Sequence, residues 1–299
     1  MHLVTKEHFL YQFSREASPA LTIHPGERVR LETRDCFSDQ IHSQEKGMEE
    51  VNWEQINPAT GPVYVEGAQP GDALKVTLEE IHFRDWAVML TGKGLGELGH
   101  KLEGMHHRIL PLRDNRLVFD DRLELPLNPM VGVLGVAPPG DPVNCGTPDT
   151  HGGNLDTTLL KEGAEVYLPV WAEGALLALG DLHAAMGDGE VCVSGAEVSG
   201  EVQIKVDLVK EMDLPTPLVT DQEVLAVIYS RKSLDEAVSG AVDIMEEIMR
   251  KGTGLATPDI AMLLSAAGRV RVSQVVDPLK TARCEVPRWI LHQYGFNLR

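Results

Sequence analysis

Cysteine is scarce in this chain of 299 residues. The four cysteines lie far apart and form no Cys-x-x-Cys pair, which argues against a zinc knuckle and against a dense disulfide scaffold. We therefore expect free thiols in a reducing compartment at Cys36, Cys145, Cys192 and Cys284.

Basic residues are also few, because 27 Lys and Arg stand against 45 Asp and Glu, for a net charge of −18. No cluster of Lys and Arg occurs anywhere along the chain. Nucleic acids and anionic membranes bind basic surfaces, so both are excluded as partners. The expected ligand is small, and neutral or cationic.

Long hydrophobic runs are missing as well. No apolar stretch reaches membrane-spanning length, and the first seven residues lack the basic and apolar regions of a signal peptide. We therefore expect a cytoplasmic protein without membrane contact. The length predicts one large β domain or two to three smaller ones.

Most of the chain has the pattern of short strands broken by Gly, Pro, Asn and Asp. Turns that begin at Pro25 and Pro70 each precede an alternating strand, which is typical of a β-sandwich or a β-barrel. The expected strands cover residues 28–33, 61–67, 73–81, 130–136, 165–170, 175–179, 190–193 and 200–208.

Helical patterns occur only late in the chain. Ser233 and Glu236 form a capping box at the start of a helix expected to end near Gly252. A second helix is expected to take Thr257 as its N-cap and to end near Gly268, before a strand over 270–276. We therefore predict a mainly β core over 1–220 and an α+β segment over 221–299.

The segment 180–190 brings three carboxylates and an imidazole together. If the apolar run before it continues as a strand, Asp181 and His183 point to the same face. Gly187 and Gly189 let the chain turn and bring Asp188 and Glu190 back beside them. Oxygen and nitrogen donors of this kind suit a divalent ion that activates water, although an exposed acidic turn gives the same pattern.

A second polar cluster, at residues 144–156, is rich in Gly and Pro and is expected to be a loop. His151, Gly152, Gly153 and Asn154 offer an imidazole, approachable backbone N–H groups and a carboxamide, which together can polarise a carbonyl and hold an oxyanion. Asp156 closes the cluster. The alternative is a structural turn in which Asn154 and Asp156 bond to their own backbone.

A third candidate lies where the strand over 28–33 ends. Asp35 can complete a metal coordination sphere, and the neighbouring Cys36 offers a thiol nucleophile. A buried, inert thiol is the alternative for Cys36, because no histidine stands beside it in the sequence.

Several of these motifs, taken in order, resemble the acetamidase/formamidase family, and the match covers nearly the whole chain. They are TRDC at 33–36, NPATGPVYVEGA at 57–68, HGGNLD at 151–156, LPV at 168–170, GDLH at 180–183 and GDGE at 187–190. The resemblance implies a mainly β fold with a jelly-roll-like β-sandwich, a small β-barrel and an α+β C-terminal portion. It also implies an oligomeric, metal-containing enzyme that hydrolyses formamide or acetamide to the carboxylate and ammonia.

The resemblance places the metal and active-site role on Asp35, Asp181, His183 and Glu190, with the 151–156 loop facing the substrate. One departure is Arg269, where an acidic residue is expected in relatives, and it puts activity or substrate range in doubt.

The mechanism predicted from these residues has a divalent metal, zinc or alternatively calcium, held by Asp35, Asp181 and His183. Glu190 moves the proton and Asn154 binds the oxyanion, so that Glu190, His183, Asn154 and Asp188 are the candidate catalytic side chains. A Cys36 or Cys145 nucleophile is the competing mechanism. The alternative function is a non-catalytic β-sandwich binding module with a structural ion, against which the imidazole of His183 argues. We expect a small amide substrate and a homo-oligomer, a dimer or larger.

Overall fold

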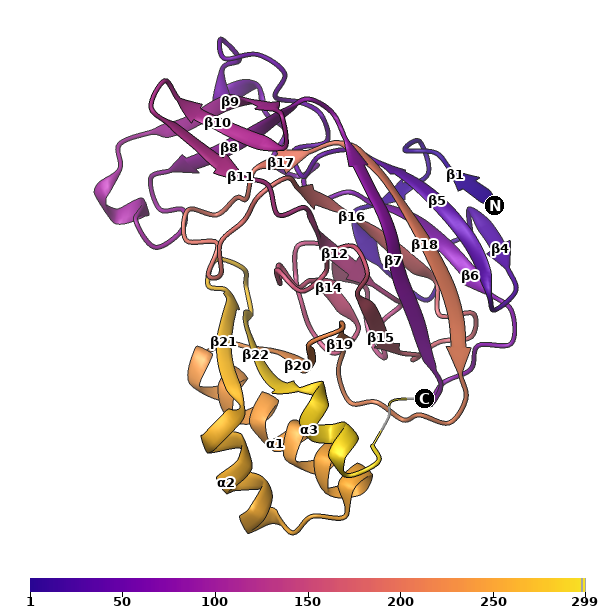
Figure 1. Cartoon of the computed structure of the whole chain (residues 1–299). Helices are drawn as coiled ribbons and strands as arrows, with labels where there is room; N and C mark the ends of the chain where they lie inside the picture. Colours follow the sequence, from indigo (N-terminus) through magenta and orange to yellow (C-terminus); the bar gives the residue numbers. More distant parts are fainter. Residues whose placement is uncertain (297, 299) are drawn as a thin grey trace.

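The computed structural model describes residues 1–296 and 298, so the end of the predicted 221–299 segment lies outside the described residues at 297 and 299. Nearly all of the strands belong to two large β-sheets, and the helices, which come late in the chain, gather at one end of the molecule (Figure 1). The mainly β prediction is therefore confirmed.

The first sheet has nine strands and includes both early and late parts of the chain. In spatial order its strands are β1 (His2–Val4), β5 (Glu27–Thr33), β18 (Gly200–Val209), β7 (Ala73–Phe83), β15 (Glu165–Pro169), β19 (Leu218–Thr220), β20 (Val224–Arg231), β22 (Lys280–Pro287) and β21 (Arg269–Gln274).

The second sheet has eleven strands, and it carries the polar cluster described below. Its main path is β11 (Leu123–Pro126), β10 (Arg116–Asp120), β9 (Met105–Arg113), β8 (Trp86–Gly92), β17 (Glu197–Val198), β16 (Leu177–His183), β12 (Met130–Gly135) and β14 (Gly152–Asn154). Beside β16 lies β6 (Ala59–Val65), which also pairs with β2 (Phe9–Leu10) and β4 (Leu21–Ile23), while β3 (Gln12–Phe13) and β13 (Val143–Asn144) form a separate pair.

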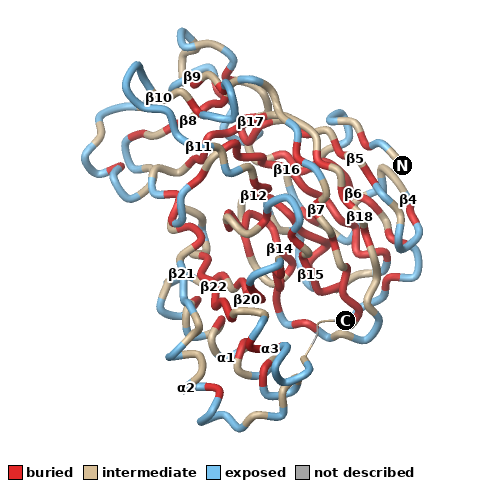
Figure 2. Tube along the Cα trace, in the orientation of Figure 1, coloured by how far each residue is buried: buried red, intermediate tan, exposed pale blue. Residues whose placement is uncertain are grey.

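The two sheets pack face to face as a β-sandwich. Alternating residues of β5, β7 and β18 meet apolar residues of β6, β12 and β16 in one large buried cluster (Figure 2). The described strands of each sheet form an open path rather than a closed ring, so the predicted small β-barrel is wrong. Turn signals alone do not distinguish a sandwich from a barrel, because both need short antiparallel strands.

The helices form a second core on the late strands. Helix α1 (Leu234–Thr253) packs on β20 and β22, next to α2 (Thr257–Ala267) and α3 (Arg288–Gln293). Two short 3-10 turns, η1 (Met48–Glu50) and η2 (Gly99–Lys101), complete the elements. Because β19 joins β20 within the nine-stranded sheet, the late segment extends the sandwich, and a domain division at residue 220 stays a prediction.

The predicted capping box is confirmed, since Ser233 Oγ accepts the N–H of Glu236 and the Glu236 side chain accepts the N–H of Ser233. Thr257 is helical rather than the N-cap, which is Ala256, and its hydroxyl donates to Glu246 instead. The strand expected over 190–193 is wrong. That segment is a turn in which the N–H of Val193 bonds to the carbonyl of Glu190.

Candidate active site

The apolar run before Asp181 does continue as a strand, β16, and this strand lies between β17 and β12 inside the sheet. His183 Nε2 is 3.3 Å from Asp181 Oδ1, as the two-residue spacing predicts. On the neighbouring strand, Glu197 lies directly opposite His183, and its Oε2 is 3.2 Å from the same nitrogen. All three side chains are buried.

Two loops bring further carboxylates to this point. Asp156 follows β14, and its Oδ1 is 3.8 Å from His183 Nε2. Glu190 comes from the turn after β16, and ligand atoms of Asp156, His183 and Glu190 all lie within 4.8 Å of one another. Asp277, from the loop between β21 and β22, accepts a 3.3 Å hydrogen bond from Asn154 Nδ2. We call Asp156, Asp181, His183, Glu190, Glu197 and Asp277 the carboxylate cluster.

Two glycines allow these side chains to approach one another. A Cβ at Gly132, on β12, would lie 2.5 Å from Asp156 Oδ1 and 2.6 Å from Asp181 Oδ2. A Cβ at Gly195 would lie 2.5 Å from His183 Nδ1. Both contacts are shorter than any allowed separation, so the site needs glycine at these positions.

The backbone is unusual at the same place. Asp156, Asp181 and Glu190 have positive φ angles of 39°, 57° and 45°. Left-handed conformations are uncommon for residues other than glycine, although Asp adopts them more readily than Glu. Such residues gather at functional sites, where the surrounding structure holds a strained geometry that function uses.

Many polar atoms of the cluster have no hydrogen-bond partner although they are buried. This is unusual, because most buried polar groups in proteins are paired. Apart from the ion pairs of His183 Nε2 with Asp181, Glu197 and Asp156, no hydrogen bond satisfies His183 Nδ1 and Nε2, both carboxylate oxygens of Asp156, Asp181 Oδ1, Glu197 Oε2 or Asp277 Oδ2, nor Asn154 Oδ1 beside the cluster. Carboxylate oxygens and imidazole nitrogens form the donor set that divalent zinc accepts, so these residues fit such an ion.

Burial and mutual repulsion control the protonation of the carboxylates. Burial raises the pKa of Glu197 to about 8. Burial, together with the nearby Glu190 and Asp181, also raises the pKa of Asp156 far above its usual value. The pKa of Glu190 and that of Asp277 rise for the same main reason, burial. Without a cation, the cluster therefore retains protons at neutral pH.

His183 is the positive partner within the cluster. Burial opposes its charge, but the adjacent Glu197 and Asp181 outweigh burial and raise the pKa of His183 well above its usual value. In turn, His183 lowers the pKa of Asp181 despite the burial of that carboxyl group. A metal ion would therefore compete with the protonated imidazole of His183 for the same carboxylates.

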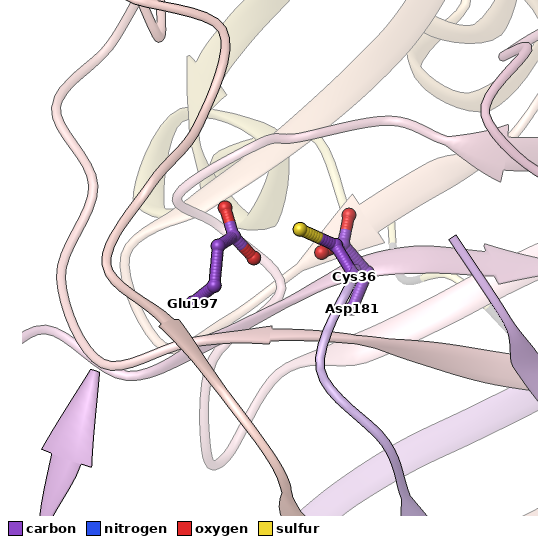
Figure 3. Close-up of side chains that lie close together, drawn as sticks. All are labelled: Cys36, Asp181 and Glu197. Atoms are coloured by element: carbon purple, nitrogen blue, oxygen red, sulfur yellow. The ribbon is translucent and has the colours of Figure 1, made fainter. Parts of the chain in front are cut away.

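Cys36 lies beside the cluster rather than apart from it. Its Sγ and one oxygen each of Asp181 and Glu197 lie within 4.8 Å of one another (Figure 3). Burial and the nearby carboxylates of Glu197, Asp181 and Asp35 raise the pKa of this thiol. The second candidate nucleophile, Cys145, is also buried, and burial raises its pKa too. Neither environment favours a thiolate.

The structure does not bring every predicted residue to the cluster. Asp35 Oδ1 accepts the backbone N–H groups of Phe37 and Asp39, and its Oδ2 accepts a 2.6 Å bond from Arg84. Neither group of potential metal ligands among the described residues includes Asp35. Because the oxygens of Asp35 are already bonded, Asp35 is not among the ligands proposed for a metal. Its metal role stays a prediction.

Asp188 is also engaged elsewhere. Its oxygens accept 3.0 and 2.7 Å bonds from Arg283, and Oδ1 accepts the Thr158 hydroxyl. Although burial opposes it, this pairing with Arg283 lowers the pKa of Asp188. These bonds connect the turn after β16 to β22, which indicates a structural role, and the catalytic role of Asp188 stays a prediction.

The 151–156 loop contributes in part. Gly152 and Gly153 have φ angles of 96° and 88° and pair with β12, while His151 packs edge-on against Phe13. Burial lowers the pKa of His151 to about 4, so this imidazole is neutral, and its Nε2 has no partner. Asp156 joins the carboxylate cluster, although the sequence predicted only a substrate-facing role for this residue.

Two members of the cluster were missed by the sequence analysis. Glu197 is a single acidic residue in a two-residue strand, and Asp277 follows a strand and precedes a proline. The available signal was that Glu197 stands between two apolar residues, Ala196 and Val198, which indicates a buried glutamate. No motif links either residue to His183, because only the sheet register and a distant loop bring them there. Arg269, the noted departure, is exposed at the start of β21.

The fold and the site define a class of protein: a β-sandwich with a buried cluster of carboxylates and one imidazole. The chain belongs to the acetamidase/formamidase family, whose model matches residues 5–144 and 141–290. Of the described residues, none forms a helix long and apolar enough to cross a membrane.

Solved structures resemble this one over nearly its full length. A recombinant predicted acetamidase/formamidase from the thermophile Thermoanaerobacter tengcongensis is 50% identical, covers 99% of both chains and superposes with a TM-score of 0.98. An acetamidase from Bacillus halodurans is 43% identical, covers 98% of this chain and 99% of its own, and has a TM-score of 0.96.

Curated relatives are more distant and longer. A formamidase of Methylophilus methylotrophus is 25% identical over 250 residues, which is 63% of this chain and 61% of the relative. An acetamidase of Mycolicibacterium smegmatis is 28% identical over 257 residues, 64% of this chain and 63% of the relative. The chain thus spans little more than three fifths of the length of these relatives.

Proposed function

We propose that this protein hydrolyses small aliphatic amides, such as formamide or acetamide, to the carboxylate and ammonia. The observation that carries the proposal is the carboxylate cluster, in which an imidazole and several carboxylates meet at one buried point and many of their polar atoms have no hydrogen bond. Membership of a family whose relatives include a formamidase and an acetamidase supports it.

A divalent metal, zinc rather than calcium, completes the proposed site. Asp181 and His183 on β16 would hold it, joined by Asp156 or Glu197, which offer oxygens close to the same imidazole nitrogen. The imidazole favours zinc, because calcium prefers oxygen alone. When bound, such an ion polarises a carbonyl and makes water more acidic.

Glu190 is the proposed proton carrier. A water molecule that attacks the amide carbon gives a proton to the Glu190 carboxylate, and the carboxyl group then gives that proton to the departing nitrogen, which leaves as ammonia. Burial raises the pKa of Glu190, and a bound cation would favour the ionised carboxylate that accepts this proton.

Asn154 is the proposed oxyanion donor. One of its two amide N–H groups is used by Asp277, so the second is free to donate to the carbonyl oxygen as negative charge develops there. The left-handed backbone of the two preceding glycines, Gly152 and Gly153, places Asn154 beside the cluster.

The test is ammonia release from formamide, acetamide and propionamide, before and after chelation and with zinc or calcium restored. We expect turnover that chelation removes and zinc restores better than calcium. Chelation without effect would contradict the metal. No turnover of any amide with metal present would favour the alternative, a non-catalytic binding module with a structural ion.

We also propose that the protein is a homo-oligomer and that it is cytoplasmic, and the four free cysteines support the second of these proposals. Light scattering of the purified protein measures its mass in solution. A mass of about one chain would contradict the oligomer, and cell fractionation tests the compartment.

A further inference from the structure

A cavity of about 550 Å³ at the surface has Glu190 among the residues that line it. It lies between the strands β8, β10 and β11 and the segment that follows β16, which run side by side in Figure 1. Its apolar walls are formed by Met89, Leu117, Phe119, Leu127, Met186 and Val191.

The other polar side chains along this cavity are already bonded within the protein. Asn128 donates to the carbonyl of Met186 and accepts its N–H, and Ser194 Oγ bonds to both backbone groups of Leu90. Asp188 is paired with Arg283. The cavity therefore combines apolar walls with two acidic residues, of which Asp188 is paired with Arg283 and Glu190 belongs to the carboxylate cluster.

The volume of this cavity exceeds that of a one-carbon or two-carbon amide. Pockets of roughly 300–1,000 Å³ are typical for drug-sized ligands, whose apolar parts fill the walls while a few polar groups orient them. A formamide or acetamide molecule at Glu190 would leave most of the cavity filled with water against apolar side chains.

We propose that, among small aliphatic amides, the preferred substrates of this protein carry an apolar group of several carbons that occupies this cavity while the amide meets Glu190. The proposal rests on the amide hydrolysis proposed above. It names Phe119, Met186 and Val191 as residues that determine specificity for that apolar group.

The first test compares the straight-chain primary amides from acetamide to hexanamide. Each methylene that leaves water for the cavity should raise kcat/KM about fourfold, from the transfer free energy of one CH₂ group. A kcat/KM that stays level or falls along the series would overturn the proposal.

Two matched variants locate the effect. Val191 is half-exposed and lines the cavity, and Val270 is equally exposed on β21 but does not line it. Val191→Trp should lower kcat/KM at least tenfold more for hexanamide than for acetamide, whereas Val270→Trp should change neither. Equal effects of the two variants, or equal effects of Val191→Trp on both amides, would contradict the cavity as the acyl site.

Binding separates failure of this inference from failure of the proposed hydrolysis. Calorimetry with the Glu190→Gln variant should give tighter binding of hexanamide than of acetamide by about two orders of magnitude, whether or not the wild type turns them over. Tighter binding without turnover would refute the hydrolysis alone. Turnover of acetamide without tighter binding along the series would refute the apolar cavity alone.

Discussion

Single side chains determine the charge of the buried centre. Four of the carboxyl groups around His183 have raised pKa values, mainly because they are buried, so one imidazolium cannot balance the whole cluster. Protons or a cation must supply the remaining positive charge. The residues of the cluster therefore differ in what they do, and single substitutions can separate those roles.

Replacing Glu190 tests the proton carrier. Glu190→Gln keeps the shape of the side chain but cannot carry a proton, so turnover should fall by about a hundredfold or more. Metal content should remain within a factor of about two, because His183 and Asp181 are unchanged. Steady-state kinetics and metal analysis measure both, with Glu211→Gln on the surface as the control. Unchanged turnover would rule out Glu190 as the carrier.

Replacing Cys36 separates the two mechanisms. Cys36→Ser removes a thiol that lies beside Asp181 and Glu197, and a thiolate mechanism should then lose nearly all activity. We expect most turnover to remain, at a stability cost of about 1–2 kcal/mol, because the surroundings raise the pKa of this thiol. Mass spectrometry of enzyme quenched with a slow amide is decisive, since an acyl adduct on Cys36 would contradict the metal mechanism.

At the scale of elements, three strands and their register build the site. Strand β16 presents Asp181 and His183, β17 presents Glu197 opposite His183, and β12 passes Gly132 beneath two carboxylates. The alternation of β16 is visible in the sequence, and it places Asp181 and His183 together as expected. The register that adds Glu197 depends on pairing between distant segments, which no local pattern encodes.

A methyl group on β12 should disturb the site without replacing any side chain of the carboxylate cluster. Gly132→Ala would place its Cβ 2.5 Å from Asp156 Oδ1, so that carboxylate must move. We expect a loss of metal affinity and at least a tenfold loss of kcat, measured by metal titration and kinetics. Gly140→Ala is the control, because nothing lies within 4 Å of its added Cβ. Equal activity of the two variants would show that the cluster tolerates the displacement.

At the scale of the whole molecule, distant parts of the chain meet at one centre. The turn after β16 is joined to the late strand β22 by Asp188 and Arg283, and Arg283 is buried. The late α+β segment therefore supports the site as well as extending the first sheet. It also supplies Asp277 directly to the cluster.

Breaking this connection should weaken the fold more than the chemistry. Asp188→Asn removes the charge that pairs with Arg283, and we expect a loss of about 2 kcal/mol in the free energy of unfolding. Denaturant titration measures it. The kcat of the folded variant should stay within a few-fold of wild type, whereas a loss similar to that of Glu190→Gln would restore a catalytic role to Asp188.

The metal-free protein should become less stable as the pH rises from about 5 to 8. Burial raises the pKa of Glu197 to about 8 and also raises the pKa of Glu190 and Asp156, so the folded chain retains protons that the unfolded chain has already released above pH ~4.5. That stabilising contribution is complete below the unfolded pKa and is lost as the pH rises through the folded one.

Thermal melting in a chelator across this range measures the effect. We expect the melting temperature to fall towards pH 8, and added zinc to restore more stability at pH 8 than at pH 5, because a cation binds the ionised carboxylates. The Glu197→Gln variant should show a flatter profile. A melting temperature that rises with pH in the metal-free protein would contradict these protonation states.

The sequence by itself determined the local features of this protein. Alternation predicted most strands, the capping box predicted α1, and the period of two predicted that Asp181 and His183 share a face, because each of these depends on neighbours within one element. The order of the motifs also indicated the family. Local reasoning was wrong at 190–193, where glycines and a left-handed Glu190 make a turn from residues that favour a strand.

Tertiary structure alone decided which side chains meet. Only the sheet register brings Glu197 to His183, only a loop from the far end of the chain brings Asp277, and only the glycine at 132 lets two carboxylates approach beneath β12. The same packing pairs Asp35 with Arg84 and Asp188 with Arg283, although the two aspartates stand in motifs that suggest the active site. The reason is physical, because a carboxylate takes its role from the charges and hydrogen-bond donors around it, and those come from strands and loops far away in the sequence.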